Sequence, residues 1–118
     1  MSTEPGQIQG HLEGLILAVM VSGPCHGYEV IRRLTASSGG VFDLPEGTVY
    51  PALHRLEKAG ALASAWQTVD ARKRRVYSIT DAGRVRLGER RERWRLFSGA
   101  ISQVLGAGAG TAEAGGPA

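Results

Sequence analysis

The sequence has little of what several large classes of protein require. Its 118 residues include one cysteine, so no internal disulfide bond can form, and we expect a reducing compartment, the cytoplasm. The longest apolar stretch, LEGLILAVMVSG, is too short to span a bilayer, so no membrane helix is expected. Aromatic residues make up only 6% of the chain. These absences leave a soluble domain with one hydrophobic core.

Cysteine and histidine are also too few for an obvious catalytic or metal site. Cys25 and His26 are neighbours, but His11 and His54 are scattered, and no third group completes a catalytic triad or a tetrahedral ligand set. We therefore expect no enzyme activity, no cofactor and no bound metal. One alternative stays open for Cys25, a role in sensing redox state or a metal.

The two ends of the chain carry few residues that could fold. Residues 1–7 lack the basic and apolar regions of a secretion signal. Residues 106–118 are mostly Gly and Ala and cannot bury enough surface to offset the entropy of ordering. We expect both segments to be disordered, with one domain over residues 8–80 and a helix over residues 81–105.

Positive charge is concentrated in one part of the chain. The net charge is only +3, yet between Arg72 and Arg95 ten Lys or Arg residues stand against three acidic ones. A local surplus of this kind indicates a polyanionic partner; a solvated charged helix is the alternative.

Two N-terminal segments have the apolar spacing of helices. Residues 8–22 predict a first helix that is mostly buried. After Gly23 and Pro24, residues 27–37 predict a second helix, with Tyr28, Ile31 and Leu34 facing the core and Arg32 and Arg33 facing solvent.

A third helix is predicted in the stretch EGTVYPALHRLEKAGAL, residues 46–62. Its apolar residues form one face, and Gly60 ends it. Pro51 fits a helix best in the first turn, so we expect a start near Gly47 or Thr48. The opposite face collects hydroxyls, an imidazole and cations: Thr48, Tyr50, Pro51, His54, Arg55 and Lys58.

The remaining segments predict a hairpin and a long helix. Residues 62–69 and 75–79 read as strands joined by the basic turn DARKR. Thr80 then caps a helix that runs to about Leu105. Leu87, Trp94 and Ile101 recur at intervals of seven along this helix, with Phe97 and Val104 in the same heptad register.

Three helices followed by a hairpin form a winged helix-turn-helix, a mainly α fold with a small β-hairpin. In that fold the outer face of the third helix enters the major groove of double-stranded DNA. The hairpin cations Arg72, Lys73, Arg74 and Arg75 would then reach the minor groove or its phosphates. The alternative is a protein-interaction module that docks a partner through its long helix.

The long helix predicts a homodimer. A helix of about 25 residues spans roughly 37 Å, more than three short helices can cover, so a second copy would bury the stripe. We expect its contacts to be Leu87, Trp94, Phe97, Ile101 and Val104. Trp94, facing its symmetry mate, would wall a slot for a small planar hydrophobic effector; the alternative is an ordinary interface residue.

Three segments resemble the PadR-like transcriptional regulators, bacterial winged-helix repressors, and specifically the small subfamily with a single C-terminal helix. They are LILAVMVSGPCHGYEVIRRL, GTVYPALHRLEKAGAL and RKRRVYSITDAGR, within roughly residues 8–105. The resemblance implies a homodimer that binds a pseudo-palindromic operator through the third helix and the wing, with the last helix as the dimer contact. Cys25 departs from the bulky aliphatic residue more usual at its position.

Overall fold

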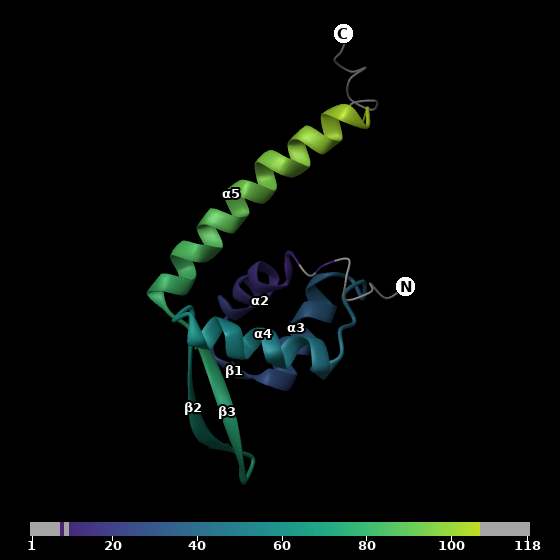
Figure 1. Cartoon of the computed structure of the whole chain (residues 1–118). Helices are drawn as coiled ribbons and strands as arrows, with labels where there is room; N and C mark the ends of the chain where they lie inside the picture. Colours follow the sequence, from purple (N-terminus) through teal and green to yellow (C-terminus); the bar gives the residue numbers. More distant parts are fainter. Residues whose placement is uncertain (1–7, 9, 107–118) are drawn as a thin grey trace. The chain divides into compact units, whose positions relative to one another are not determined.

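The computed structural model describes residue 8 and residues 10–106 (Figure 1). Its elements are α2 (Leu12–Met20), β1 (Cys25–His26), α3 (Gly27–Ser37), α4 (Glu46–Lys58), β2 (Leu62–Val69), β3 (Arg72–Ile79) and α5 (Asp81–Val104). The mainly α fold with a small sheet is therefore confirmed. The segments predicted to be disordered, residues 1–7 and 106–118, lie outside the described residues apart from Gly106.

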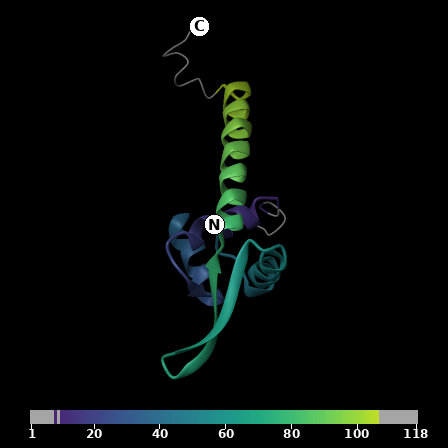
Figure 2. The same cartoon turned by 90° about the vertical axis from the view of Figure 1, so that its left-hand side faces the viewer.

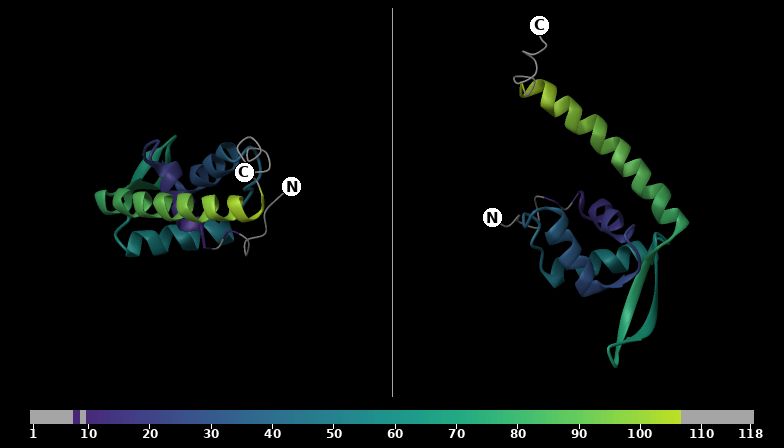
Figure 3. Two further views of the ribbon diagram at one scale, coloured as in Figure 1. Left: turned by 90° about the horizontal axis from the view of Figure 1, so that it is seen from above. Right: turned by 180° about the vertical axis from the view of Figure 1, so that it is seen from behind.

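Helices α2, α3 and α4 pack around the hydrophobic core of a first compact unit that ends at Leu87. Each helix buries one apolar face, and the side chains of Ile16, Val30, Leu53 and Leu56 are fully buried. The hairpin of β2 and β3 extends away from these three helices (Figure 3). This arrangement leaves the outer face of α4 and both strands of the hairpin accessible.

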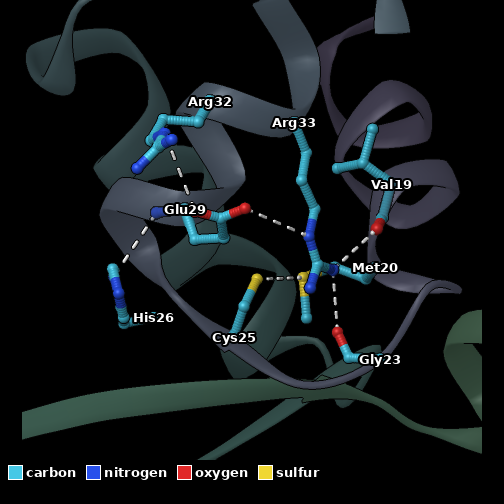
Figure 4. A network of polar contacts seen from close by, with 8 residues as sticks. All are labelled: Val19, Met20, Gly23, Cys25, His26, Glu29, Arg32 and Arg33. Atoms are coloured by element: carbon cyan, nitrogen blue, oxygen red, sulfur yellow. Dashed lines mark hydrogen bonds and ion pairs between the residues drawn. The ribbon is translucent and has the colours of Figure 1, made fainter. Parts of the chain in front are cut away.

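The orientation of α3 differs from the prediction at two residues, although its bounds are as predicted. Tyr28 is 50% exposed rather than in the core, because the buried face of α3 runs through Val30 and Leu34. Arg33 does not face solvent: its Nη1 donates to the carbonyl oxygens of Val19, at 3.0 Å, and Gly23, at 2.8 Å. Carbonyls at a helix end have no partner within the helix, so Arg33 ties the end of α2 to α3 (Figure 4).

The bounds of α2 and α4 differ from the predicted ones, because these helices start or end at other residues than expected. Helix α2 is shorter than the predicted 8–22. Helix α4 begins at Glu46 after Pro45, so Pro51 lies beyond the first turn, where we did not expect it. Proline has no N–H, and the bond from residue 51 to the carbonyl of Gly47 is missing. Tight packing on the buried side offsets this loss, because Val49, Ala52 and Leu53 have no exposed surface.

The sheet has three antiparallel strands in the order β1, β3, β2. The sequence did not predict β1, which pairs Cys25 with Tyr77 and His26 with Val76. The β2–β3 pairing runs from Leu62 opposite Ile79 to Val69 opposite Arg72. The two strands lie side by side along their whole length (Figure 2).

The hairpin turn contains only two residues, not the predicted five. Asp70 and Ala71 both have positive φ, 53° and 64°, as a two-residue type I′ turn requires. Arg72, Lys73 and Arg74 are therefore strand residues at the start of β3, and the prediction that placed them in a turn was wrong.

The first turn of α5 is fastened to the base of the hairpin. Thr80 caps the helix as predicted: its Oγ1 accepts the Gly83 N–H at 3.0 Å and donates to the Gly60 carbonyl at 2.6 Å. Gly83 is buried, and a Cβ built there would overlap the carbonyl oxygen of Ala61 and lie 2.8 Å from Cγ1 of Ile79. A residue without a side chain is thus needed at this contact.

The chain divides into two compact units after Leu87, within α5. Leu87 is only 4% exposed and packs in the core of the first unit, and its role as a dimer contact stays a prediction. In the second unit Trp94, Phe97, Ile101 and Val104 are exposed. Within the described part of the chain, no helix combines the length and apolar character needed to cross a membrane.

Candidate nucleic-acid interface

The first unit contains a groove of about 320 Å³ between α4, the start of α3 and the hairpin. Residues from all three elements line it: His26, Gly27, Tyr28, Tyr50, Leu53, His54, Trp66, Lys73, Arg74, Arg75 and Tyr77. Three of these residues are cations, and none of those named here is acidic. The groove therefore suits a negatively charged ligand with some apolar surface.

The outer face of α4 borders this groove through only part of its predicted contact set. Tyr50 and His54, four residues apart and so on one side of the helix, line the groove. Pro51, Arg55 and Lys58 are exposed elsewhere on the outer face, and Thr48 is half-buried. Helix α4 thus presents one flank to the hairpin and another to solvent.

Tyr50 is held by close contact with α3. A Cβ at Gly27 would lie 2.9 Å from Cε1 of Tyr50, so the glycine lets the tyrosine ring approach the start of α3. Burial raises the pKa of Tyr50, and Glu46 raises it further, whereas Arg74 acts in the opposite direction. The hydroxyl therefore remains a neutral donor at physiological pH.

Arg55 lies on the flank of α4 that faces α2. Its Nε is 3.4 Å from Oε2 of Glu13, whose other carboxylate oxygen is 4.0 Å from Nη1 of Arg86. An ion pair this exposed contributes about 0 to 1 kcal/mol, so it positions Arg55 without preventing a stronger partner from replacing Glu13. The structure does not bring Arg55 into the groove with the hairpin cations.

Arg75 is engaged within the protein. Its Nε donates to Oγ of Ser64 at 2.9 Å, and its Nη2 is 3.4 Å from Oε2 of Glu57. Ser64 donates to the same carboxylate at 2.6 Å, which lowers the pKa of Glu57, and Arg75 lowers it further. The guanidinium carbon also lies 5.6 Å from the ring centroid of Trp66. Arg75 thus braces the hairpin against α4.

The other three cations of β3 are freer to meet a ligand. Arg72 and Lys73 are exposed, and Arg74 is half-buried. The Nε of Arg74 is buried without a hydrogen-bond partner, and among the described residues no ion pair involves Arg74. The four predicted hairpin cations therefore differ in their surroundings. Arg75 is bound within the protein, whereas Arg72, Lys73 and Arg74 can still bind a ligand.

Cys25 and His26 have structural surroundings (Figure 4). Nδ1 of His26 accepts the Glu29 N–H at 3.4 Å, which caps α3. The thiol of Cys25 is buried, with Sγ 3.9 Å from Sδ of Met20. Burial raises the pKa of this thiol, so it stays protonated and slow to react at neutral pH. These contacts favour packing over the sensing alternative.

The sequence model of the transcriptional regulator PadR-like family matches residues 16–89. The chain belongs to the PadR family. Transcriptional regulator Rv3488 of Mycobacterium tuberculosis is 48% identical over 87 residues, 74% of this chain and 76% of that protein.

Solved structures agree with the family assignment. A transcriptional regulator from Clostridium thermocellum has a TM-score of 0.76 at 28% identity, covering 83% of this chain and 96% of that one. A PadR-like transcriptional regulator from Bacillus cereus has a TM-score of 0.74 at 29% identity, covering 85% and 96%.

PadR membership confirms the resemblance found in the sequence and makes the chain a DNA-binding transcriptional regulator rather than an enzyme. The matched residues include the whole groove and the first part of α5. Sequence reasoning missed the groove residues Tyr28 and Trp66, and the acids Glu13 and Glu57 that hold the arginines. Of these residues, Trp66 alone could have been found from the sequence. A two-residue turn at Asp70 and Ala71 would have placed it directly opposite Arg75.

Proposed function

We propose that this PadR-family chain is a cytoplasmic repressor that binds a pseudo-palindromic double-stranded operator as a homodimer. The observation that carries the proposal is the groove in which residues of α4 and cations of β3 meet. A reading helix and a basic hairpin on one surface can contact adjacent parts of a duplex together. If the helix and the hairpin lay on different surfaces of the chain, their charges could not contact one stretch of duplex together.

The exposed residues of α4 have different chemical roles in this proposal. Arg55 leaves Glu13 and donates two hydrogen bonds to a guanine in the major groove. Thr48, Pro51 and His54 lie near base edges, and Lys58 meets the DNA backbone. From the hairpin, Arg72 and Lys73 contact phosphates without reading sequence.

The exposed stripe of the second unit supports the homodimer. Large apolar side chains on one helix are costly in water, and a second copy of the same helix would bury them. Trp94 and Phe97 already lie with ring centroids 6.1 Å apart. In a dimer this pair would wall the slot for a planar hydrophobic effector. Two-fold pairing would place the α4 helices about 34 Å apart, one turn of DNA, so the operator is an inverted repeat.

Selection of duplexes from a random library, followed by anisotropy titration, tests the proposal. We expect the wild-type protein to enrich an inverted repeat. Arg55→Ala should lower the ratio of operator to random-duplex affinity about 5- to 150-fold, equivalent to about 1–3 kcal/mol. Lys58→Ala, one turn away on the same helix, is the matched control and should weaken both duplexes alike.

Two results would contradict the proposal. If Arg55→Ala weakened operator and random duplexes equally, Arg55 would not read a base. If no duplex were enriched, sequence-specific regulation would fail and the interaction-module alternative would be favoured. Repression itself is tested by placing the selected repeat over a reporter promoter, where the protein should lower expression.

A further inference from the structure

We propose that Tyr28, Tyr50 and Arg74 together hold one phosphate of the DNA backbone in the groove. The identity of the ligand rests on the proposed function, because the groove chemistry alone asks only for an anion. The three residues come from three elements, α3, α4 and β3, and all line the groove. The site would fix the position of the duplex and carry no sequence information.

The three side chains line the same groove. Tyr50 interacts electrostatically with both Tyr28 and Arg74. Two phenol hydroxyls and one guanidinium can all donate hydrogen bonds, and none of them can neutralise another. A phosphate group, with several acceptor oxygens and a negative charge, satisfies all three.

The size of the groove fits a backbone unit better than a bare ion. Its volume of about 320 Å³ is in the range of small-molecule sites, which is more than one phosphate fills. The rings of Tyr28, Tyr50 and Trp66 supply apolar walls beside the cations. A phosphodiester with its adjoining deoxyribose offers the matching combination of charge and apolar surface.

Arg74, rather than Arg75, is the cation available to this ligand. Arg75 already has Glu57, Ser64 and the Trp66 ring as partners. The Nε of Arg74 is buried without a hydrogen-bond partner, an arrangement that costs free energy until an acceptor arrives. Among the described residues no ion pair engages Arg74 either, so its guanidinium group is available to a phosphate in the groove.

Tyr28 has no role in the core that would explain its place. It is a large aromatic residue left half-exposed at the start of α3, while Val30 and Leu34 make the buried face of that helix. Its neighbour Gly27 keeps the backbone close to the Tyr50 ring, which brings the two tyrosines to the same wall. Its hydroxyl would orient the phosphate without adding charge.

The test measures affinity for a random-sequence duplex by anisotropy over a series of salt concentrations. Arg74→Gln should make the slope of log K against log salt shallower by about 0.9, because one counterion fewer is released. Tyr28→Phe should weaken binding severalfold at every salt concentration and leave the slope unchanged. Arg95→Gln removes one arginine charge from α5, outside the groove; it is the matched control, and its slope should equal that of the wild type. Circular dichroism establishes that each variant retains its helices.

A second arm uses the duplex chosen by selection, with single phosphates replaced by neutral methylphosphonates. The wild type should lose affinity at one position in each half-site, and Arg74→Gln should lose nothing further at that position. An unchanged slope for Arg74→Gln, an equal change of slope for Arg95→Gln, or wild-type affinity of Tyr28→Phe would overturn the site. If the library yields no preferred duplex but the slope still depends on Arg74, the operator proposal fails and the phosphate site stands.

Discussion

A glycine-to-alanine change at residue 83 tests how the hairpin is joined to α5. Alanine favours an exposed helix interior over glycine by about 1 kcal/mol. At Gly83, however, the new methyl group would overlap the Ala61 carbonyl and press on Ile79. Overpacking of this kind costs about 1–3 kcal/mol, and displacing Ala61 also strains the 3.1 Å hydrogen bond from the Thr80 N–H to its carbonyl, worth about 1 kcal/mol. We expect Gly83→Ala to lower the free energy of unfolding by about 1–3 kcal/mol.

Gly88→Ala is the control, since a Cβ there meets nothing within 4 Å. This variant should be stabilised by up to about 1 kcal/mol through helix propensity alone. Urea titrations at one fixed protein concentration, followed by circular dichroism, give both midpoints. The two variants should differ by about 1–4 kcal/mol, so with a urea dependence of about 1–3 kcal/mol per molar their midpoints should differ by roughly 0.3–4 M. Equal midpoints would mean that α5 does not pack tightly on the base of the hairpin.

Three further changes probe other contacts. Glu13→Gln removes the partner of Arg55 and should strengthen binding of the selected operator up to about fivefold by anisotropy; unchanged affinity would show that the ion pair does not compete with DNA. Arg33→Met leaves the Val19 and Gly23 carbonyls without their donor and should cost about 2 kcal/mol in urea unfolding, whereas a change below experimental error would argue against this cap. Replacing Trp94 and Phe97 with Ala should yield monomers in sedimentation at micromolar concentration, and a persistent dimer would place the interface elsewhere.

Apolar periodicity was enough to predict most elements of the fold. The bounds of α3 and β2 were confirmed residue for residue, because each segment has a consistent period and is bounded by glycine or polar residues. Strand β1 was missed since its two residues carry no periodic signal and exist as a strand only through pairing with β3. The start of β3 was read as a turn because Arg and Lys have low strand propensity, which pairing with β2 overrides.

The candidate site was predictable in composition but not in geometry. Sequence reasoning selected Tyr50, His54 and the cations of β3, which the structure gathers at one groove. It had no means of separating Arg75 from Arg74, because that difference depends on Glu57 and Ser64 from other elements. Tyr28 was placed inward because an aromatic side chain at helical spacing is more often buried than exposed.

The short turn fixes the spacing of the cations along the hairpin of β2 and β3. With only Asp70 and Ala71 outside the ladder, every cation of β3 is pinned by a partner on β2, at a rise of about 3.3 Å per residue and on alternating faces. The cations are therefore spaced before DNA binds, so binding costs little conformational entropy of the hairpin. An insertion or deletion of one residue in either strand would shift the pairing by one residue and turn every cation of β3 to the opposite face of the hairpin.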